Sequence, residues 1–449
     1  MAYKQKKDSD NYPKLSKKQR DKRVARLRGM KDIVFDEYKY WDLAIQKAHD
    51  LARSFDFKRI DTPILEKAEL YKKSSGEETD VVSKEMYEFV DKNGEKVALR
   101  PEATPGLVRS YIENGMFNQP QPVKMFWLGP IFRHEKPQSG RYRQSHQFDL
   151  EIFGEESPMA DFLIILIAYD FFKELQIDIQ VQINSIGCSD CKQGYLEELK
   201  KFFKKKKNQI CADCKRRLTK SPLLLLDCKN EKCQELNEEA PPIVDYLCES
   251  CQDKFTKILE YLDELDIPYN LNPHLVRGLD YYTGPVFEFW PVDEKGDVLW
   301  DSFALGGGGR YDNLVEFMGG RPAPACGMGI GLERAIMRIK ENNIPIYDLE
   351  EDVIFMAQLG DQARRKMVSL FEEMRRAGYR VKQSFTKDSL KDQLEIANNL
   401  NAKISLILGQ KEVNDNTILL RDMESGNQEV VDYKKIRSEV DKRINNDNY

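Results

Sequence analysis

Residues 126–154 read FWLGPIFRHEKPQSGRYRQSHQFDLEIFG, and they decide how the rest of the chain is interpreted. The stretch opens apolar, turns at Gly129-Pro130, crosses a polar loop with Gly140 near its tip, and returns through the largely apolar residues 148–153. Two apolar arms around a polar, glycine-containing loop predict a long antiparallel hairpin. Arginine and glutamate side chains lie at the inner ends of the arms. They indicate either bidentate capture of phosphate or carboxylate, or a solvated hairpin tip.

The composition is that of a globular chain with about two or three domains. Of its 449 residues, 41% are hydrophobic and 32% are charged. The longest apolar run, Phe162 to Tyr169, is far shorter than a membrane span, and no apolar leader follows Met1. We therefore expect a cytoplasmic protein that makes no use of a membrane.

Charge is unevenly distributed along the chain. The net charge is −5, yet residues 1–31 carry twelve Lys or Arg and three Asp. Such a local excess of positive charge is typical of a nucleic-acid contact or of a solubilising tail. Because apolar residues are only scattered there, residues 1–27 are predicted to form a basic disordered arm.

A long helix followed by an edge strand is predicted next. Residues 36–56 place apolar side chains at helical spacing, with Asp36 as a plausible N-cap. Residues 60–64 then alternate as a strand does, and Pro63, which has no N–H, restricts that strand to an edge or a bulge. The pair is either a dimer surface, through residues 36–56 and 58–65, or an ordinary packed edge.

A second hairpin is predicted at residues 86–90 and 97–100. It ends in ArgProGluAlaThrPro, at 100–105, just before a helix. A Glu and a Thr at such a junction either bind an ammonium group or cap the helix. Apolar spacing further predicts a buried helix at 162–172, strands at 177–183, 269–271, 275–282, 286–289 and 298–305, and a glycine-rich strand entering a helix at 327–334.

The last hundred residues have a pattern of their own. After a linker at 342–350, they predict a strand at 353–359, a helix at 361–377 capped by Gly378, a strand at 379–385, a helix at 389–400 and a strand at 403–408. Alternation of this kind predicts a small parallel sheet covered by helices.

Eight of the nine cysteines fall within residues 188–251. Their spacing, largely in CxxC pairs, favours tetrahedral zinc over disulfides in a chain without a leader, with free thiols as the alternative. The order of the cysteines does not assign them to individual ions. The candidate ligands are Cys188, Cys191, Cys211, Cys214, Cys228, Cys233, Cys248 and Cys251, while the isolated Cys326 is expected in the core.

Six motifs occur in the order found in one known family. They are LRPEAT (99–104), FRHE (132–135), GRYRQ (140–144), LVRGLDYYT (275–283), GGRYD (308–312) and GMGIGLER (327–334). The chain from about Arg28 onward resembles the histidyl-tRNA synthetases, which are class II aminoacyl-tRNA synthetases. The resemblance implies an α+β fold with an antiparallel six-stranded catalytic sheet, a Cys-rich insertion, a C-terminal α/β anticodon-binding domain, and a homodimer.

The resemblance and the composition together imply six segments. They are a basic disordered arm (1–27), the first part of a catalytic domain (28–187), a Cys-rich insertion (188–265), the second catalytic part (266–341), a linker (342–350) and an anticodon-binding domain (351–449).

The implied reaction is ATP-dependent ligation of L-histidine to tRNA(His) through a histidyl-adenylate. The attacking carboxylate is already ionised, so the reaction calls for positioning and for positive charge from arginine and Mg²⁺. By resemblance, Arg133 holds the α-phosphate and the carboxylate, Arg334 holds the γ-phosphate, and Arg277 supplies charge at the α-phosphate. Glu135 meets the adenine side. Any zinc is implied to be structural.

The resemblance also implies the residues that bind histidine and tRNA. For histidine they are Arg277, then Glu102, Thr104 and Gln147 on the amino-group side, Glu151 and Tyr282 at the ring, and Tyr281 and Tyr311 along the pocket. For tRNA they are Lys136, Gln138 and Arg141. Core packing is the alternative role for Tyr281 and Tyr282.

Two positions depart from the family pattern. Ser145 stands where an aromatic residue usually stacks on adenine, so that Phe132 or Phe148 is the candidate substitute. Lys136 stands where arginine is usual, and lysine cannot form the same planar fork.

Two other functions compete with this one. A histidine-sensing regulatory subunit of histidine biosynthesis would keep a similar core but lack residues 351–449 and commonly lose catalytic arginines. A zinc-dependent nucleic-acid-binding protein would explain the cysteines and the basic arm but not the arginine and glycine motifs. Histidine-dependent exchange of pyrophosphate into ATP distinguishes the enzyme from both.

Overall fold

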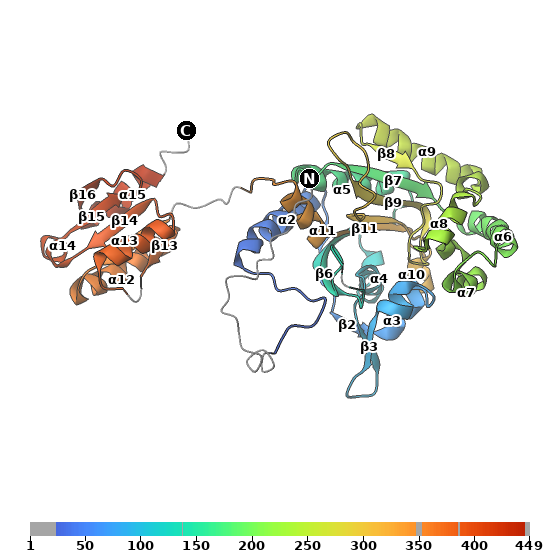
Figure 1. Ribbon diagram of the computed structural model, residues 1–449, viewed down its shortest axis with the longest axis horizontal. Helices are drawn as coiled ribbons and strands as arrows, with labels where there is room; N and C mark the ends of the chain where they lie inside the picture. Colours follow the sequence, from blue (N-terminus) through green and yellow to red (C-terminus); the bar gives the residue numbers. More distant parts are fainter. Residues whose placement is uncertain (1–23, 137, 347–352, 385–386, 445–449) are drawn as a thin grey trace. The chain divides into compact units, whose positions relative to one another are not determined.

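The chain, in a computed structural model, divides into two compact units at residues 346 and 347 (Figure 1). The structure describes residues 24–136, 138–346, 353–384 and 387–444. Most of the predicted basic arm, and residues 347–350 of the predicted linker, lie outside these described residues. Within them, no helix has both the length and the apolar character that crossing a membrane requires.

An eight-stranded sheet forms the centre of the first unit. In sheet order its strands are β1 (Lys58–Arg59), β5 (Val123–Phe132), β6 (Gln144–Phe153), β11 (Ala325–Gly331), β10 (Gly306–Arg310), β9 (Thr283–Pro291), β7 (Ile179–Ser185) and β8 (Tyr269–Leu271). The prediction of six antiparallel strands is therefore wrong for the whole sheet. The six inner strands are antiparallel, but β1 and β8 add parallel edges. These edges are two and three residues long, too short for a periodic pattern.

The predicted hairpin of residues 126–154 is confirmed as β5 and β6. Their register runs from Val123 opposite Phe153 to Phe132 opposite Gln144. The predicted turn at Gly129-Pro130 is wrong, because β5 continues through both residues. Pro130 is tolerated since the neighbouring edge of β5 pairs with β1 only at Met125 and Phe126.

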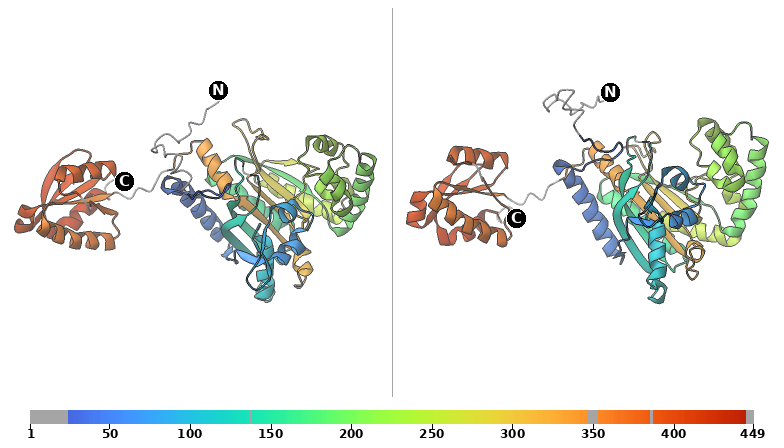
Figure 2. Two further views of the ribbon diagram at one scale, coloured as in Figure 1. Left: turned by 60° about the horizontal axis from the view of Figure 1, so that its bottom comes forward. Right: turned by 90° about the horizontal axis from the view of Figure 1, so that it is seen from below.

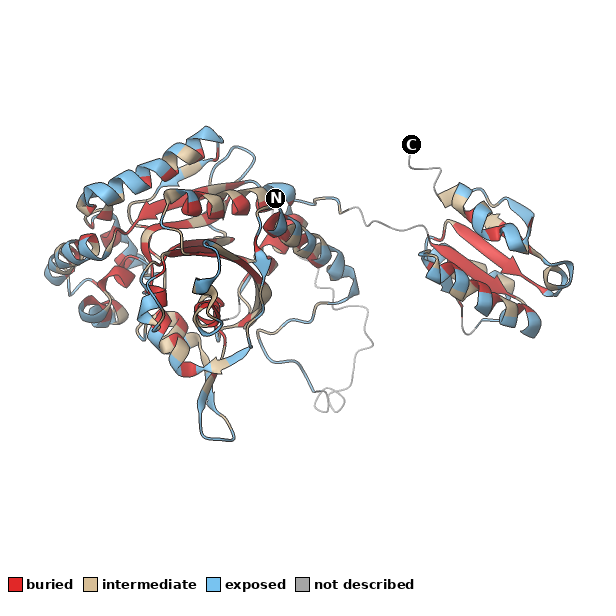
Figure 3. Cartoon of the chain, turned by 180° about the vertical axis from the view of Figure 1, so that it is seen from behind, coloured by how far each residue is buried: buried red, intermediate tan, exposed pale blue. Residues whose placement is uncertain are grey.

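Four helices cover one face of this sheet. They are α2 (Phe35–Ser54), α5 (Pro158–Glu174), α9 (Glu249–Glu264) and α11 (Leu332–Glu341). Figure 3 shows their inner sides buried and their outer sides exposed. The predicted helices 36–56 and 162–172 are confirmed as α2 and α5. The N-cap of α2 is Val34 rather than Asp36, which lies in the first turn, where its charge favours the helix dipole.

Three predicted strands are wrong. Residues 60–64 connect β1 to β2 outside the sheets, around Pro63. Residues 275–282 form a loop, because their apolar side chains pack into a buried cluster instead of a ladder. Residues 298–305 make one isolated bridge, between Val298 and Val292, before β10 begins.

A small three-stranded sheet lies beside the main one. Its order is β2 (Leu65–Lys67), β4 (Lys96–Leu99) and β3 (Tyr87–Val90), so the hairpin predicted at 86–100 is confirmed. Helices α3 (Ala68–Ser75) and α4 (Thr104–Glu113) flank it, a helical turn follows at Val81–Glu85, and α10 (Leu314–Phe317) is a further short helix.

The Cys-rich segment, residues 188–265, is helical. It contains α6 (Ser189–Lys205), α7 (Ala212–Lys220), α8 (Glu231–Glu238) and α9, with short 3-10 turns at Pro222–Leu225 and Ile243–Tyr246. Figure 2 shows α6 to α8, in green, gathered at one end of the first unit, away from the blue helix α2.

The second unit confirms the predicted β-α-β-α-β order. Strands β13 (Val381–Gln383), β12 (Ile354–Gln358) and β14 (Ile404–Leu408) are parallel, with helices α12 (Asp361–Arg376) and α13 (Leu390–Asn399) between them. Gly378 follows α12 with φ +95°, as its predicted capping role requires. The antiparallel β15 (Thr417–Asp422) and β16 (Gln428–Asp432), and helices α14 (Gln410–Asp415) and α15 (Ile436–Ile444), complete it.

A buried ion pair joins the central sheet to α5. The Nε of Arg310, at the end of β10, lies 3.1 and 3.0 Å from the two carboxylate oxygens of Asp161. The side chains are 5% and 2% exposed. Removal of one partner from such a pair leaves an uncompensated charge in the interior.

The Asp161→Ala variant should therefore lose about 3–5 kcal/mol of unfolding free energy in urea denaturation followed by circular dichroism. The double variant Asp161→Leu/Arg310→Met, which removes both charges, should lose much less. An equal loss in the two variants would show that packing, not the orphaned arginine, carries the effect.

Candidate functional site

The two faces of β6 have opposite characters. Phe148, Leu150 and Ile152 point into the main hydrophobic core and are at most 1% exposed. Residues 147, 149 and 151, which are Gln, Asp and Glu, point to the other face, because side chains alternate along a strand. A row of three polar groups therefore crosses the middle of the sheet on the face opposite α2, α5 and α11.

Glycines on the neighbouring strands make room for the functional side chains. A Cβ atom on Gly327 of β11 would lie 1.6 Å from Oε2 of Glu151. A Cβ on Gly307 of β10 would lie 2.7 Å from a terminal nitrogen of Arg277. These glycines allow a carboxylate and a guanidinium to lie flat against the sheet.

One large cavity, about 840 Å³ in volume, opens on this polar face. We call it the central cavity. Seven of the predicted site residues line it: Arg133, Glu135, Gln138, Arg141, Gln147, Arg277 and Arg334. Lys136, the remaining predicted tRNA contact, is exposed and is not among the described residues that line the cavity.

Several arginines line the central cavity, together with carboxylates such as Glu135, Glu288 and Glu333. Arg334 donates from Nη1 to the carbonyl of Ala304 at 2.6 Å, and its guanidinium lies 5.2 Å from the centre of the Phe303 ring. Burial, and then the like charge of Arg141, lower the pKa of Arg334 to about 10. Crowded guanidinium groups of this kind favour the binding of an anion.

Arg277 has a carboxylate partner in this structure. Its Nη1 donates to Glu288 of β9, whose other oxygen accepts from the indole N–H of Trp290 at 3.0 Å. Arg133 is anchored differently, since its Nε donates to the carbonyl of Pro101 at 2.7 Å. Both arginines are thus held by the protein before any ligand binds.

The remaining predicted histidine-binding residues form a buried network deeper in the unit. Thr104 donates to Glu151 at 2.6 Å, and Tyr311 donates to its other oxygen. Tyr281 donates to Glu102 at 2.8 Å. Tyr282 packs against Tyr281 with ring centres 4.6 Å apart.

The alternative in which Glu102 and Thr104 cap a helix is wrong. Helix α4 has Ala103 at its N-cap and no side-chain cap hydrogen bond. Both side chains instead bond to residues of the buried network. Tyr281 and Tyr282 belong to a core cluster, as the packing alternative requires, and the hydroxyl of Tyr281 also bonds to Glu102.

The buried carboxyl groups bind protons more tightly than ordinary ones. Burial raises the pKa of Glu151 to about 8, although the hydrogen bonds from Thr104 and Tyr311 oppose the shift. Burial also raises the pKa of Glu102 and, together with the charge of Glu151, that of Asp149. A cationic ligand would reverse these shifts, so the network is suited to an ammonium group or a protonated ring.

Ser145 faces the central cavity, and one of the two expected substitutes for its missing ring, Phe148, is wrong. Phe148 is fully buried on the opposite face of β6, and Phe132 is not among the described residues that line the cavity. The aromatic residues that do line it near the hairpin tip are Tyr142 and Phe303.

Sequence reasoning missed several residues of the site. Asp149 lies between Gln147 and Glu151, and residues two apart in a strand share one face. The alternation in the sequence could therefore have identified it. Phe303 and Ser75 carried no such signal, because they reach the site from a loop and from the end of α3. Ser75 donates to Glu102.

The structure sorts the eight cysteines into two groups of four. In each group the ligand atoms lie within 4.8 Å of one another. The first group is Cys188, Cys191, Cys248 and Cys251, and the second is Cys211, Cys214, Cys228 and Cys233. Cys326, as expected, is fully buried in the core.

The sulfur geometry fits tetrahedral zinc. A Zn–S distance of about 2.3 Å places the sulfurs of a tetrahedron about 3.8 Å apart. The Sγ atoms of Cys211 and Cys228 are 3.8 Å apart, and those of Cys188 and Cys191 are 3.5 Å apart. Backbone N–H groups also point at the sulfurs, as from Cys248 to Cys191 at 3.0 Å, which favours thiolate.

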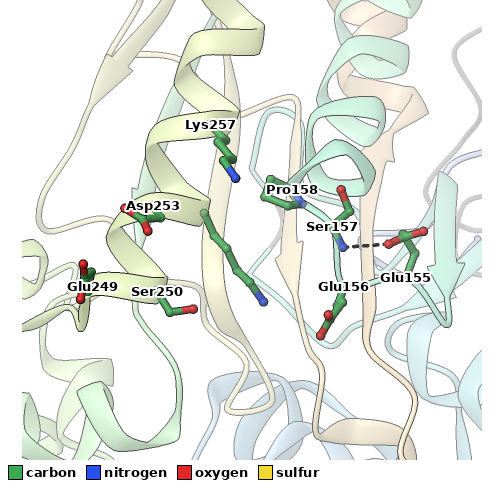
Figure 4. A pocket seen from close by; sticks show the side chains of 9 residues that line it. Glu155, Glu156, Ser157, Pro158, Glu249, Ser250, Asp253 and Lys257 are labelled. Atoms are coloured by element: carbon green, nitrogen blue, oxygen red, sulfur yellow. Dashed lines mark hydrogen bonds between the residues drawn. The ribbon is translucent and has the colours of Figure 1, made fainter.

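A second groove, about 540 Å³ in volume, lies between the start of α5 and α9. Figure 4 shows Lys257 and Asp253 on one side and the turn at Ser157 on the other, where the Ser157 N–H donates to Glu155 at 2.9 Å. Its described lining residues include none of the predicted site residues, and they carry charges of both signs.

Comparisons with known proteins agree with the geometry. Residues 29–335 match the family model for histidyl-tRNA synthetase, and residues 352–443 match that for an anticodon binding domain. The chain is 40% identical over 415 residues to a histidine–tRNA ligase of Natranaerobius thermophilus, covering 92% of this chain and 97% of the relative. It is 41% identical over 404 residues to that of Thermosipho melanesiensis, covering 90% and 95%.

A solved structure is similar over the same length. The crystal structure of apo histidyl-tRNA synthetase from S. aureus matches with a TM-score of 0.78 and 31% identity, covering 93% of this chain and 99% of that chain. The chain therefore belongs to the histidyl-tRNA synthetase family and is a ligase that joins histidine to tRNA(His) with ATP.

Proposed function

We propose that the central cavity binds ATP beside histidine and forms histidyl-adenylate there. The observation that carries this proposal is the convergence of Arg133, Arg277 and Arg334 on one cavity that adjoins a buried carboxylate network. A carboxylate oxygen of histidine attacks the α-phosphorus, and pyrophosphate leaves. Since the nucleophile is already ionised, the residues act by position and charge, and no general base is required.

Each arginine has a separate task in this proposal. Arg133, at the end of β5, holds the α-phosphate and the histidine carboxylate. Arg334, on α11, holds the γ-phosphate, and Arg277 places positive charge at the α-phosphate after leaving Glu288. Glu135 meets the adenine. Mg²⁺ neutralises further phosphate charge when it accompanies ATP.

The buried network recognises the amino acid. Glu102 and Gln147 face the ammonium group, with Thr104 beside them, while Glu151 and Tyr282 face the imidazole. A buried carboxylate opposite a ring nitrogen rejects apolar amino acids, which would leave it unpaired. Tyr281 and Tyr311 hold the two carboxylates in place through their hydroxyl groups.

The remaining parts are proposed to bind tRNA. Lys136, Gln138 and Arg141 at the hairpin tip contact the acceptor end, with contacts to phosphate that weaken as salt increases. Residues 351–449 form the anticodon-binding domain, since RNA sequence is read most readily from unpaired bases. The segments 28–187 and 266–341 form the catalytic domain, with 188–265 as an insertion.

Three further properties are proposed for the whole protein. The eight cysteines hold two zinc ions, because two groups of four sulfurs fit two tetrahedral sites. The protein is cytoplasmic. It is a homodimer, and the exposed Ile64 and Leu65 lie in the contact between the two subunits. The apolar face of α2 is buried in the core of the first unit, so it does not form that contact.

Arg277→Ala should lower the rate of histidine-dependent pyrophosphate exchange by about 10²–10³, because one fixed donor to the transition state is lost. Arg277→Lys should recover part of the rate. Arg53→Ala, at an exposed position of α2, serves as the matched control. Near-normal exchange by a folded Arg277→Ala protein would refute the assignment.

Glu151→Gln should make stability less dependent on pH. Because the folded pKa of Glu151 is about 8, above the ordinary value of 4.5, folding takes up a proton between these values. The wild-type protein should therefore lose stability as the pH rises toward 8, by up to about 1.4 kcal/mol per pH unit from this group. Urea unfolding at several pH values compares the two proteins.

The control for the pH experiment is the exposed Glu316→Gln, which should follow the wild type. Parallel curves for the wild type and Glu151→Gln would mean that Glu151 is ionised in the folded protein throughout this range.

A chain ending at Ile346, the last residue of the first compact unit, should retain histidine-dependent pyrophosphate exchange and charge tRNA(His) poorly. The physical reason is that adenylate formation uses only the central cavity and the buried network, both in the first unit, whereas charging requires the tRNA to be held. Equal charging by the truncated and full chains, at matched salt, would give the second unit another role.

A further inference from the structure

The Cys-rich segment supplies one wall of the central cavity. Arg217, Leu224, Asp227 and Lys229 line the cavity from this segment, and Asp80 lines it from the turn that follows α3. A Cβ atom on Gly278 would lie 3.5 Å from Oδ2 of Asp227, so this carboxylate rests against the loop that carries Arg277. The wall therefore contacts segments that hold predicted catalytic and histidine-binding residues.

Ion pairs attach this wall to the first part of the unit. Four of them join α7 to residues 78–84, and we call them the α7 ion pairs: Arg217 with Asp80 (2.8 Å), Lys84 with Asp213 (2.8 Å), Arg216 with Glu78 (3.1 Å) and Lys220 with Glu78 (2.5 Å). The side chain of Arg217 is 7% exposed, whereas that of Arg216 is 47% exposed. Exposed pairs contribute little, so the attachment depends mainly on Arg217.

A chain of hydrogen bonds continues from α7 to the histidine network. Ser221, just after α7, donates to Asp280 at 3.2 Å, and the backbone N–H of Asp280 donates to the carbonyl of Ser75 at 3.2 Å. The hydroxyl of Ser75 donates to Glu102. The position of α7 is thus transmitted to a carboxylate that faces the substrate amino group in the proposed function.

The second cysteine group holds the three parts of this wall together. Cys211 is the N-cap of α7 and accepts the N–H of Cys214 at 3.4 Å. Cys228 directly follows Asp227. Cys233 lies in the first turn of α8 and accepts the N–H of Cys211 at 3.3 Å. Arg217 is one helical turn from one ligand, and Asp227 adjoins another.

This part of the segment is built from short elements, which pack into a shared buried cluster. Helices α7 and α8 are nine and eight residues long, and the loop between them contains a 3-10 turn of four residues. Helices this short are marginal on their own, and a metal bound by four thiolates supplies folding free energy directly. Leu223, Leu225 and Leu226 belong to the buried cluster that also contains Val276, Tyr281 and Tyr282, so this part of the segment packs against the loop that carries Arg277.

The first cysteine group is placed differently. It joins the starts of α6 and α9, which are seventeen and sixteen residues long. Next to it, the backbone of Ile186 donates to Gly284 at 2.7 Å, and Gly284 donates to Gly187 at 2.9 Å. Main-chain contacts to β9 therefore hold this end of the segment with or without a metal.

We propose that Cys211, Cys214, Cys228 and Cys233 form a tetrathiolate zinc site that positions Arg217 and Asp227 in the wall of the central cavity. Loss of zinc from this site weakens the binding of histidine to the enzyme. Loss of zinc from the first cysteine group weakens it far less. The inference rests on the proposed function of the cavity and on zinc binding by the cysteines. The four cysteines are positioning residues and do not touch the substrate.

The test uses the full-length protein and two matched variants, Cys228→Ser and Cys188→Ser, each at a half-buried cysteine. Zinc is counted by elemental analysis, and Co²⁺ substitution reports thiolate ligands by absorption. Each variant should lose about one zinc. Cys228→Ser should raise the KM for histidine in pyrophosphate exchange about 10-fold to 100-fold, with kcat less affected, whereas Cys188→Ser should stay close to wild type.

A second pair of variants leaves every cysteine intact. Arg217→Met should keep the wild-type zinc content and raise the KM for histidine, and Arg217→Lys should restore part of the affinity. Arg216→Met, at the next position of α7 but exposed, should have a smaller effect. A KM unchanged by Arg217→Met would overturn the route through the α7 ion pairs.

Three other results would overturn the inference. They are a wild-type protein without zinc, a Cys228→Ser protein that loses zinc with an unchanged KM, and equal KM changes in Cys228→Ser and Cys188→Ser. Absence of exchange in a zinc-loaded wild-type protein would instead refute the proposed function, and the inference with it.

Discussion

Side chains of β6 point alternately to the two faces of the central sheet, and the rest of the first unit depends on this alternation. Phe148, Leu150 and Ile152 are buried under the helices, while the intervening Gln147 and Glu151 reach the opposite face. A shift of one residue in the register would exchange the two sets. The hydrophobic core therefore fixes the register, and the register fixes the positions of the polar groups.

Room for those polar groups comes from the neighbouring strands. Gly327 and Gly307 lie where any Cβ atom would overlap Glu151 or Arg277. Glycine in a strand interior is unfavourable by roughly 0.5–1 kcal/mol relative to alanine. These glycines therefore destabilise the sheet locally, but they allow a carboxylate and a guanidinium to lie against the backbone.

Buried ionisable groups of both signs in the site have shifted pKa values. Near the hairpin tip, burial and a neighbouring guanidinium lower the pKa of Arg334, and deeper in the unit burial raises the pKa of Glu102 and Glu151. Burial is the largest cause of each shift, because it disfavours the charged form of any group. An opposite charge placed beside either kind of group would reverse its shift.

Much of this protein was determined by its sequence. Periodicity predicted α2, α5, the β5–β6 hairpin and the alternating second unit, because long periodic segments reflect one buried face. The ordered motifs indicated the family, and the resemblance implied seven of the residues that line the central cavity. Periodicity could not predict short or irregular segments. Strands β1 and β8 have too few residues to show a period. Residues 275–282 form a loop although their apolar pattern resembles that of a strand.

Only the tertiary structure decided which distant groups meet. The order of eight cysteines allowed several pairings, and the packing of the helices that carry them separated them into two groups. The fold also brought Arg217 to Asp80, 137 residues earlier in the chain, and Phe303 to the site from a loop. Local sequence determines local geometry and which face is apolar. Contacts between distant segments depend on how whole elements pack, and no local pattern contains that information.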